Sequence, residues 1–119
     1  MGVEDIINLS EVKCIKNLNY EVLLLVYVYG TNLIKIDSII GEEHSINPQS
    51  SENILKRYIN LKAHKFFTVH NHPNRNVAPS INDLLCFERM RRELTSKGVK
   101  YEDDIIVGGN DWFSVNKEL

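Results

Sequence analysis

The stretch Lys65-Phe66-Phe67-Thr68-Val69-His70-Asn71-His72-Pro73 decides how this chain is expected to fold. Its opening residues are mostly aromatic or β-branched, so they predict a β-strand that ends near His72. Residues two apart on a strand face the same side of the sheet, so His70 and His72 can point together. Pro79-Ser80 marks the expected start of a helix, which can bring Asp83 back beside the end of the strand.

Two imidazoles and one carboxylate are the ligands that a catalytic zinc ion uses when it keeps one position open for water. Each part of the pattern also has a simpler interpretation. Histidine pairs occur at surface turns, and Ser80 with Asp83 fits the capping box that begins many helices. A capping box does not exclude a metal role for Asp83. The whole pattern of two histidines, a fixed gap, a serine and an aspartate is far more specific than either piece, and it indicates a metal site.

The surrounding residues predict alternating strands and helices. Residues 6–15 fit either a short helix or an edge strand. The next expected elements are a central strand over 21–29, a turn at 30–32, a strand over 33–40, a loop over 45–50 and a helix over 51–61. After the motif we expect a helix over 82–96 capped by Gly98, then strands over 101–107 and 112–115. The core stripe of that helix should comprise Leu84, Leu85, Phe87, Met90 and Leu94.

This order of elements predicts an α/β fold, with a single mixed β-sheet flanked by helices. Hydrophobic residues make up 43% of the chain and charged residues 25%, which suits one globular domain over residues 1–119 that needs no disulfides. We therefore expect Cys14 and Cys86 to be reduced core residues. Residues 1–5 resemble no secretory signal, and the apolar run over 22–29 is too short to span a bilayer. These features predict a cytoplasmic protein without membrane contact.

The net charge of −2 argues against strong, nonspecific binding of nucleic acid over the whole surface. One group of cations is the exception, and it comprises Arg89, Arg91, Arg92, Lys97 and Lys100. Glu88 and Glu93 alternate with these cations. A solvated helix face is therefore the favoured interpretation, and a phosphate-binding patch is the alternative.

The pattern His70-x-His72-Pro73-x6-Ser80-x2-Asp83 resembles the JAMM motif of the MPN-plus metalloproteases. More narrowly, the chain is similar to the JAB domain of RadC-like proteins from about residue 20 to 115. Supporting strings are Asn53-Ile54-Leu55-Lys56-Arg57, Val69-His70-Asn71-His72-Pro73 and Asp103-Asp104-Ile105-Ile106-Val107-Gly108. The resemblance implies the MPN or JAB fold, which has similarities to the cytidine-deaminase architecture. The helix-hairpin-helix segment that often precedes this domain in RadC proteins is not expected here, which weakens an inherited role in DNA repair.

The resemblance also implies a role for each residue of the site. The implied metal ligands are His70, His72 and Asp83, which would hold a zinc ion. Glu21, at the start of the first long strand, is in register with the glutamate that serves as the family's general base. Ser80 occupies the position of the motif serine, which stabilises the oxyanion of the tetrahedral intermediate.

Four other residues are candidates for the base or for a metal ligand. Glu42 and Glu43 rank second as the base, since they lie in a polar stretch beyond the expected hairpin. His44 falls in the same loop, and His64 precedes the strand that carries the motif. We assign neither histidine to the metal.

Two positions depart from the RadC-like pattern. Asn74-Arg75 stands where these chains usually have Ser-Gly after the motif proline. Asp103-Asp104 stands where they usually have Asp-His. Neither position is a motif ligand, so we expect metal binding to survive, and the departures bear instead on how a substrate fits near the loop.

The resemblance implies a zinc-dependent hydrolase that cleaves a peptide or isopeptide bond in a peptide or protein substrate. One alternative is an accessory protein of DNA repair or of a mobile element, which would use the basic helix. Another is a metal-binding MPN module without turnover. Zinc deaminases are excluded because the sequence lacks their paired HxE and PCxxC motifs.

Overall fold

The computed structural model describes residues 1–40 and 48–118. Its centre is a five-stranded sheet in the order β2-β1-β3-β4-β5. The strands are β1 (Val22–Tyr29), β2 (Asn32–Ile40), β3 (Lys65–Asn71), β4 (Tyr101–Gly108) and β5 (Asp111–Ser114). Only β3 and β4 pair in parallel, and the other neighbouring pairs are antiparallel. The sheet is therefore mixed, as predicted.

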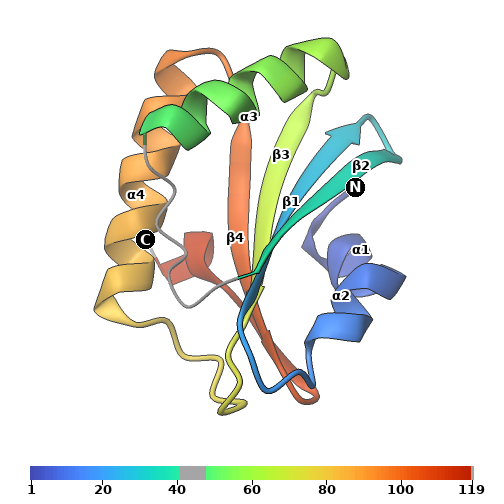
Figure 1. Ribbon diagram of the computed structural model, residues 1–119, viewed down its shortest axis with the longest axis vertical. Helices are drawn as coiled ribbons and strands as arrows, with labels where there is room; N and C mark the ends of the chain where they lie inside the picture. Colours follow the sequence, from blue (N-terminus) through green and yellow to red (C-terminus); the bar gives the residue numbers. More distant parts are fainter. Residues whose placement is uncertain (41–47, 119) are drawn as a thin grey trace.

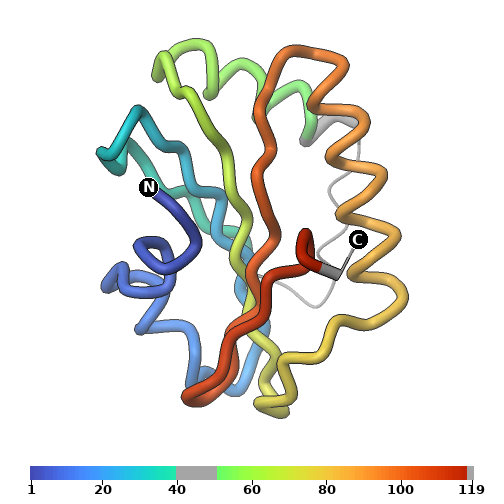
Figure 2. Tube along the Cα trace, turned by 180° about the vertical axis from the view of Figure 1, so that it is seen from behind, coloured from blue at the N-terminus to red at the C-terminus, as the bar shows by residue number. Residues whose placement is uncertain are grey.

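Helices cover both faces of this sheet (Figure 1 and, from behind, Figure 2). The helices are α1 (Val3–Ile7), α2 (Ser10–Ile15), α3 (Pro48–Asn60) and α4 (Ile81–Ser96), followed by the 3-10 helix η1 (Val115–Glu118). α1 and α2 lie on one face, and α3 and α4 lie on the other. This confirms the predicted α/β fold. For residues 6–15 the sequence allows a short helix or an edge strand; most of them lie in α1 and α2, and Ile6, Val12 and Ile15 are buried.

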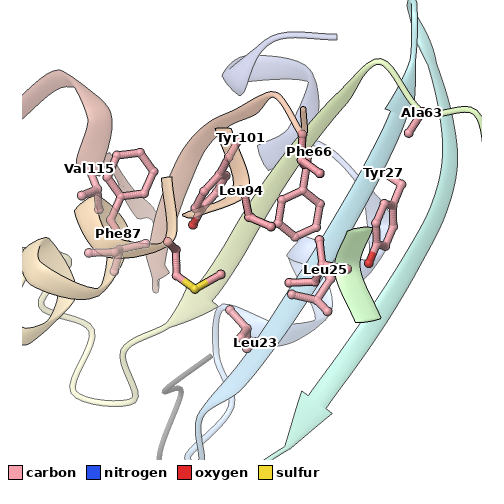
Figure 3. Close-up of a cluster of buried hydrophobic side chains, with 13 residues drawn as sticks. Leu23, Leu25, Tyr27, Ala63, Phe66, Phe87, Leu94, Tyr101 and Val115 are labelled. Carbon is pink, nitrogen blue, oxygen red and sulfur yellow. The ribbon is translucent and has the colours of Figure 1, made fainter. Parts of the chain in front are cut away.

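β1 is an inner strand, and it is buried from Val22 to Val28 because both of its faces are covered. Its side chains alternate between the two faces. Leu23 and Leu25 belong to the core cluster beneath α3 and α4, which Figure 3 shows, while Leu24 packs in the cluster beneath α1 and α2. The face that carries α4 is also the face of the candidate site.

α4 links the end of β3 to the start of β4, as two parallel neighbouring strands require. Phe87, Met90 and Leu94 bury this helix against the sheet, so its first turn stays beside the end of β3. Leu85 was expected in the same stripe but is 61% exposed. No helix in the described part of the chain has the length and apolar character to cross a membrane.

Two further expectations differ from the structure. α3 begins at Pro48, three residues before the predicted start, because the first turn of a helix accepts a proline that has no amide hydrogen to donate. Glu42, Glu43 and His44 lie outside the described residues.

The prediction of two core cysteines is wrong. Cys14 is exposed, and Cys86 is half-buried; both are free thiols in the structure. Helical geometry explains the difference, because α2 turns Val12 and Ile15 toward the sheet and leaves Cys14 on its outer side. Cys86 similarly flanks the buried stripe of α4.

Candidate metal centre

The two histidines of the motif come from the end of β3. His70 is in the strand and pairs in register with Leu23 of β1 and Ile106 of β4. His72 follows the strand, and its backbone N–H donates to the Val107 carbonyl over 3.0 Å. This bond keeps the chain extended past the strand end. The two rings therefore face the same side, with centroids 5.1 Å apart.

The third residue, Asp83, comes from the first turn of α4. Ser80 is the N-cap of this helix, and its hydroxyl accepts a hydrogen bond from the Asp83 N–H over 3.0 Å. In return, Asp83 Oδ2 accepts from the Ser80 N–H over 2.9 Å. The predicted capping box is therefore confirmed. It also orients the Asp83 carboxylate toward the strand end.

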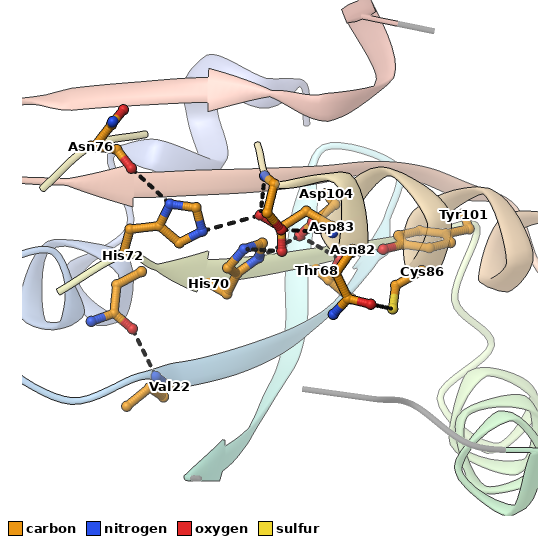
Figure 4. Close-up of polar contacts among 12 residues, drawn as sticks. Val22, Thr68, His70, His72, Asn76, Asn82, Asp83, Cys86, Tyr101 and Asp104 are labelled. Carbon is orange, nitrogen blue, oxygen red and sulfur yellow. Dashed lines mark hydrogen bonds and ion pairs between the residues drawn. The ribbon is translucent and has the colours of Figure 1, made fainter. Parts of the chain in front are cut away.

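The capped carboxylate meets both imidazole rings, as Figure 4 shows. Asp83 Oδ1 lies 3.3 Å from His70 Nε2, and Oδ2 lies 3.2 Å from His72 Nε2. One ligand atom from each of the three residues lies within 4.8 Å of the other two. The helix cap and the metal-ligand pattern thus describe the same side chain, and the two interpretations are compatible.

The donor set suits a divalent cation such as zinc. Two imidazole nitrogens and one carboxylate oxygen form a three-ligand set of the kind that leaves a fourth position open. The His72 tautomer fits this use. Its Nδ1 lies 2.7 Å from the Asn76 carbonyl oxygen, which can only accept, so Nδ1 carries a proton and Nε2, the nitrogen that faces Asp83, is the one that a neutral ring could offer to a metal. This His-His-Asp group could therefore bind a metal.

The electrostatics of the cluster favour positive charge at its centre. Burial disfavours the charged form of His70, but the carboxylates of Asp104 and Asp83 outweigh it and raise the pKa of His70 to about 10. The hydrogen bond with Asp83 raises the pKa of His72 as well. Burial disfavours the charged form of Asp83 too, yet its bonds to both histidines hold the pKa of that carboxyl well below its usual range. A metal cation could take the place of the histidine protons that balance the negative charge of these carboxylates.

Glu21, the expected base, lies directly before β1. The Asn71 side chain bonds to the residues on either side of it: its Oδ1 accepts from the Val22 N–H over 2.7 Å, and its Nδ2 donates to the Tyr20 carbonyl over 2.9 Å. The register of β1 with β3 pairs Leu23 with His70. Continued by two residues, this register places Glu21 opposite His72. The glutamate and the motif are therefore brought to the same end of the sheet.

Two residues of this region were missed from the sequence. Asn71, between the two histidines, holds the start of β1. Asp104 contacts His70, with its Oδ1 3.1 Å from the ring Nδ1. One signal could have found Asp104, which is a carboxylate directly before the apolar run Ile105-Ile106-Val107 of a buried strand. Such carboxylates are rarely buried without a partner.

His64 lies apart from the cluster. It precedes β3, at the end of the strand opposite His70, and its exposed ring is 4.1 Å from that of Tyr29. Ser80, the expected oxyanion donor, is exposed at the N-terminus of α4. Its hydroxyl accepts only one bond in the cap, so its proton is free to be donated elsewhere.

A mixed sheet with a His-His-Asp group between a strand end and the following helix defines a JAMM-like α/β domain. The family model described as RadC-like JAB domain matches residues 3–119. The chain therefore belongs to the RadC-like JAB domain family. The match confirms the resemblance seen in the motif and extends it through α1 and α2.

Relatives in several bacteria share the family. A UPF0758 protein of Streptococcus suis is 36% identical over 76 residues, which cover 62% of this chain and 31% of that protein. A UPF0758 protein of Lactococcus lactis is 29% identical over 105 residues, which cover 87% of this chain and 46% of that protein. The UPF0758 protein YeeS of Escherichia coli is 38% identical over 61 residues, or 51% of this chain and 41% of that protein. The chain thus spans less than half the length of these relatives, whose names state no activity.

Proposed function

We propose that this domain is a zinc-dependent metallohydrolase that cleaves a peptide or isopeptide bond. The observation that carries the proposal is the convergence of His70, His72 and Asp83, whose ligand atoms lie within 4.8 Å of one another. Membership of the RadC-like JAB family supports it. The zinc ligands are the two Nε2 atoms and the Asp83 carboxylate. When bound, the ion polarises a water molecule and the scissile carbonyl.

Glu21 is the general base in this proposal. The bonds from Asn71 hold the backbone around it. The alternation of β1, continued one residue before the strand, supports a position on the same side as Leu23, in the layer of α4 and the proposed metal centre. From there its carboxylate takes a proton from the attacking water and passes it to the leaving nitrogen. The proton of the Ser80 hydroxyl stabilises the developing oxyanion, an effect of about 3 kcal/mol for such a donor.

The first experiment measures zinc in protein purified without added metal. We expect about one zinc ion per wild-type chain and almost none in His72→Ala, because that variant loses one of three ligands. His64→Ala is the matched control, since it removes an exposed imidazole outside the cluster and should leave the zinc content unchanged. Equal, near-zero zinc in the wild type and His72→Ala would sink the proposal.

The second experiment separates a hydrolase from a metal-binding module without turnover. Glu21→Gln should keep the zinc of the wild type and lower the hydrolysis of peptide and isopeptide-linked substrates by about 100- to 10,000-fold. Wild-type protein loaded with zinc but inert toward both kinds of substrate would favour the non-hydrolytic module.

The DNA-accessory alternative has less support, because several cations of the basic helix contact side chains of this chain. Lys97 forms an ion pair with Glu52, and Lys100 forms one with Glu102 at 3.2 Å. Arg91 bonds to Asn116. Titration against DNA at low and moderate salt tests this alternative, since phosphate contacts give an affinity that falls steeply with salt. No binding at low salt would dispose of it.

A further inference from the structure

We propose that Asp104 is a positioning residue of the metal centre. Its carboxylate holds the His70 ring with Nε2 turned toward Asp83, and it strengthens cation binding through that ring. This inference rests on the metal centre of the proposed function. It assigns to that centre a residue outside the His-His-Asp motif, one that touches a ligand and is not itself a ligand.

The contacts on the two sides of the His70 ring carry the inference. Asp104 Oδ1 lies 3.1 Å from Nδ1, and Asp83 Oδ1 lies 3.3 Å from Nε2, so the ring is held between two carboxylates (Figure 4). An ionised carboxylate can only accept hydrogen bonds. Nδ1 must therefore donate to Asp104, and in the neutral ring the lone pair lies on Nε2. That nitrogen faces the other two ligands.

The sheet and its hydroxyl groups fix Asp104 in this position. Thr68 of β3 is the register partner of Asp104 in β4, and its hydroxyl donates to Asp104 Oδ1 over 2.9 Å. The hydroxyl of Tyr101 is in turn hydrogen-bonded to Thr68. All three side chains are buried. A carboxylate in such a place is costly unless it is bonded, and its partners here are a hydroxyl and the proposed metal ligand.

The second histidine lacks a charged partner of this kind. His72 Nδ1 donates to the neutral Asn76 carbonyl, in a loop where the histidine is only partly buried. A carboxylate behind a metal-ligating imidazole makes the ring more basic and limits its rotation, and removal of such a partner typically weakens metal binding 10- to 100-fold. His70, buried and backed by Asp104, is therefore the anchoring ligand of the pair.

The test compares two neighbouring buried carboxylates. Asp104→Asn removes the negative charge behind His70 while keeping its shape. Asp103→Asn is the matched control, because Asp103 is equally buried in β4 but accepts bonds from Ser114 and the Asn116 backbone, away from the ring. Zinc affinity, measured by competition with a chelator, should fall about 10- to 100-fold in Asp104→Asn and change little in Asp103→Asn.

A spectroscopic readout distinguishes positioning from a general loss of structure. In the zinc-loaded wild type, the Nδ1 proton of His70 should give a downfield NMR resonance that exchanges slowly, because it is buried and bonded to a carboxylate. In Asp104→Asn this resonance should move upfield and exchange faster. In Asp103→Asn it should stay in place.

Two outcomes overturn the role of Asp104: wild-type zinc affinity in Asp104→Asn, or equal losses in both variants. His72→Ala, titrated in parallel, separates this failure from that of the metal centre. If His72→Ala loses zinc and Asp104→Asn does not, only the role of Asp104 is wrong; if His72→Ala keeps wild-type affinity, the centre itself is wrong and the inference falls with it.

Should Asp104→Asn not fold, Thr68→Val removes the hydroxyl that holds Asp104. A several-fold weaker affinity is then expected, and an unchanged one overturns the inference.

Discussion

Arg75 occupies a backbone conformation that glycine adopts more readily. Its φ angle is 64°, in the left-handed region that side chains with a Cβ disfavour. Arg75 closes the turn that begins at His72, because its N–H donates to the His72 carbonyl over 2.8 Å. The glycine that the RadC-like pattern implies at this position therefore has a physical reason. This chain forms the same turn with an arginine, whose backbone is strained by the positive φ angle.

Replacing Arg75 with glycine should therefore stabilise the protein. The left-handed conformation costs a residue with a Cβ about 1–2 kcal/mol, whereas the extra freedom of glycine in the unfolded chain costs about 0.5–1 kcal/mol. We expect Arg75→Gly to raise the free energy of unfolding by about 0.5–1 kcal/mol, measured by urea denaturation of the metal-free protein. Ala78→Gly, in the same loop but without a positive φ, should change it in the opposite direction. A loss of stability in Arg75→Gly would contradict the account.

At the level of elements, the first turn of α4 has two separable properties. Ser80 caps the helix through its oxygen, and in the proposed mechanism it donates through its hydrogen. Because Asp83 is fixed by the same cap, loss of the cap should disturb this proposed metal ligand as well as the helix. A single alanine substitution cannot distinguish these effects, but a pair of substitutions can.

Ser80→Ala should lower the free energy of unfolding by about 1 kcal/mol, because the Asp83 N–H loses its acceptor. Asparagine caps helices about as well as serine, so Ser80→Asn should restore most of that stability. Asparagine has no hydroxyl, however, and hydrolysis should stay low in both variants. Denaturation curves and hydrolysis rates measured on the same preparations check this. If Ser80→Asn hydrolysed substrate as fast as the wild type, the hydroxyl would have no part in hydrolysis and would serve only to cap the helix.

Elements with a strong local signal were predictable from the sequence. Aromatic and β-branched residues predicted β3, and the serine–aspartate spacing predicted the start of α4 and with it the third proposed ligand. Asp104 could not be found in this way, because its contact with His70 depends on the parallel register of β3 with β4. The bond between Asn71 and Val22, 49 positions apart, depends likewise on the antiparallel register of β1 with β3. Strand register is a property of tertiary packing, and a single sequence does not carry it.

At the scale of the whole molecule, the sheet separates two hydrophobic clusters of different character. The cluster under α1 and α2 is mainly aliphatic, whereas the cluster under α3 and α4 contains two tyrosines, Tyr27 and Tyr101. Burial and the nearby Asp37 carboxylate raise the pKa of Tyr27 to about 12. Burial, followed by the charge of Asp104, raises the pKa of Tyr101 as well. The folded protein therefore favours the neutral phenol at both positions.

These shifts predict that the protein loses stability in alkaline solution. An acid whose pKa is raised by folding contributes to the free energy of unfolding. The contribution is complete below the pKa of the unfolded state, about 10 for tyrosine, and it is lost as the pH rises toward the pKa of the folded state. The free energy of unfolding should thus fall between pH 10 and about 12, measured by urea denaturation across this range. Tyr27→Phe should make the fall shallower. Tyr29→Phe, at an exposed position, is the control and should follow the wild type; an equal slope in all three proteins would contradict the assignment to Tyr27.

The amide of Asn71 has a consequence for how such a domain could change in evolution. The three proposed ligands lie within 14 consecutive residues, from His70 to Asp83, whereas Glu21, the proposed base, precedes β1, whose start is bonded to Asn71. In the proposed mechanism, holding a cation and using it for hydrolysis thus depend on different segments of the chain. Under this proposal, a descendant that altered Asn71 or the start of β1 could keep its ion and its shape while losing turnover, and would then act as a binding domain.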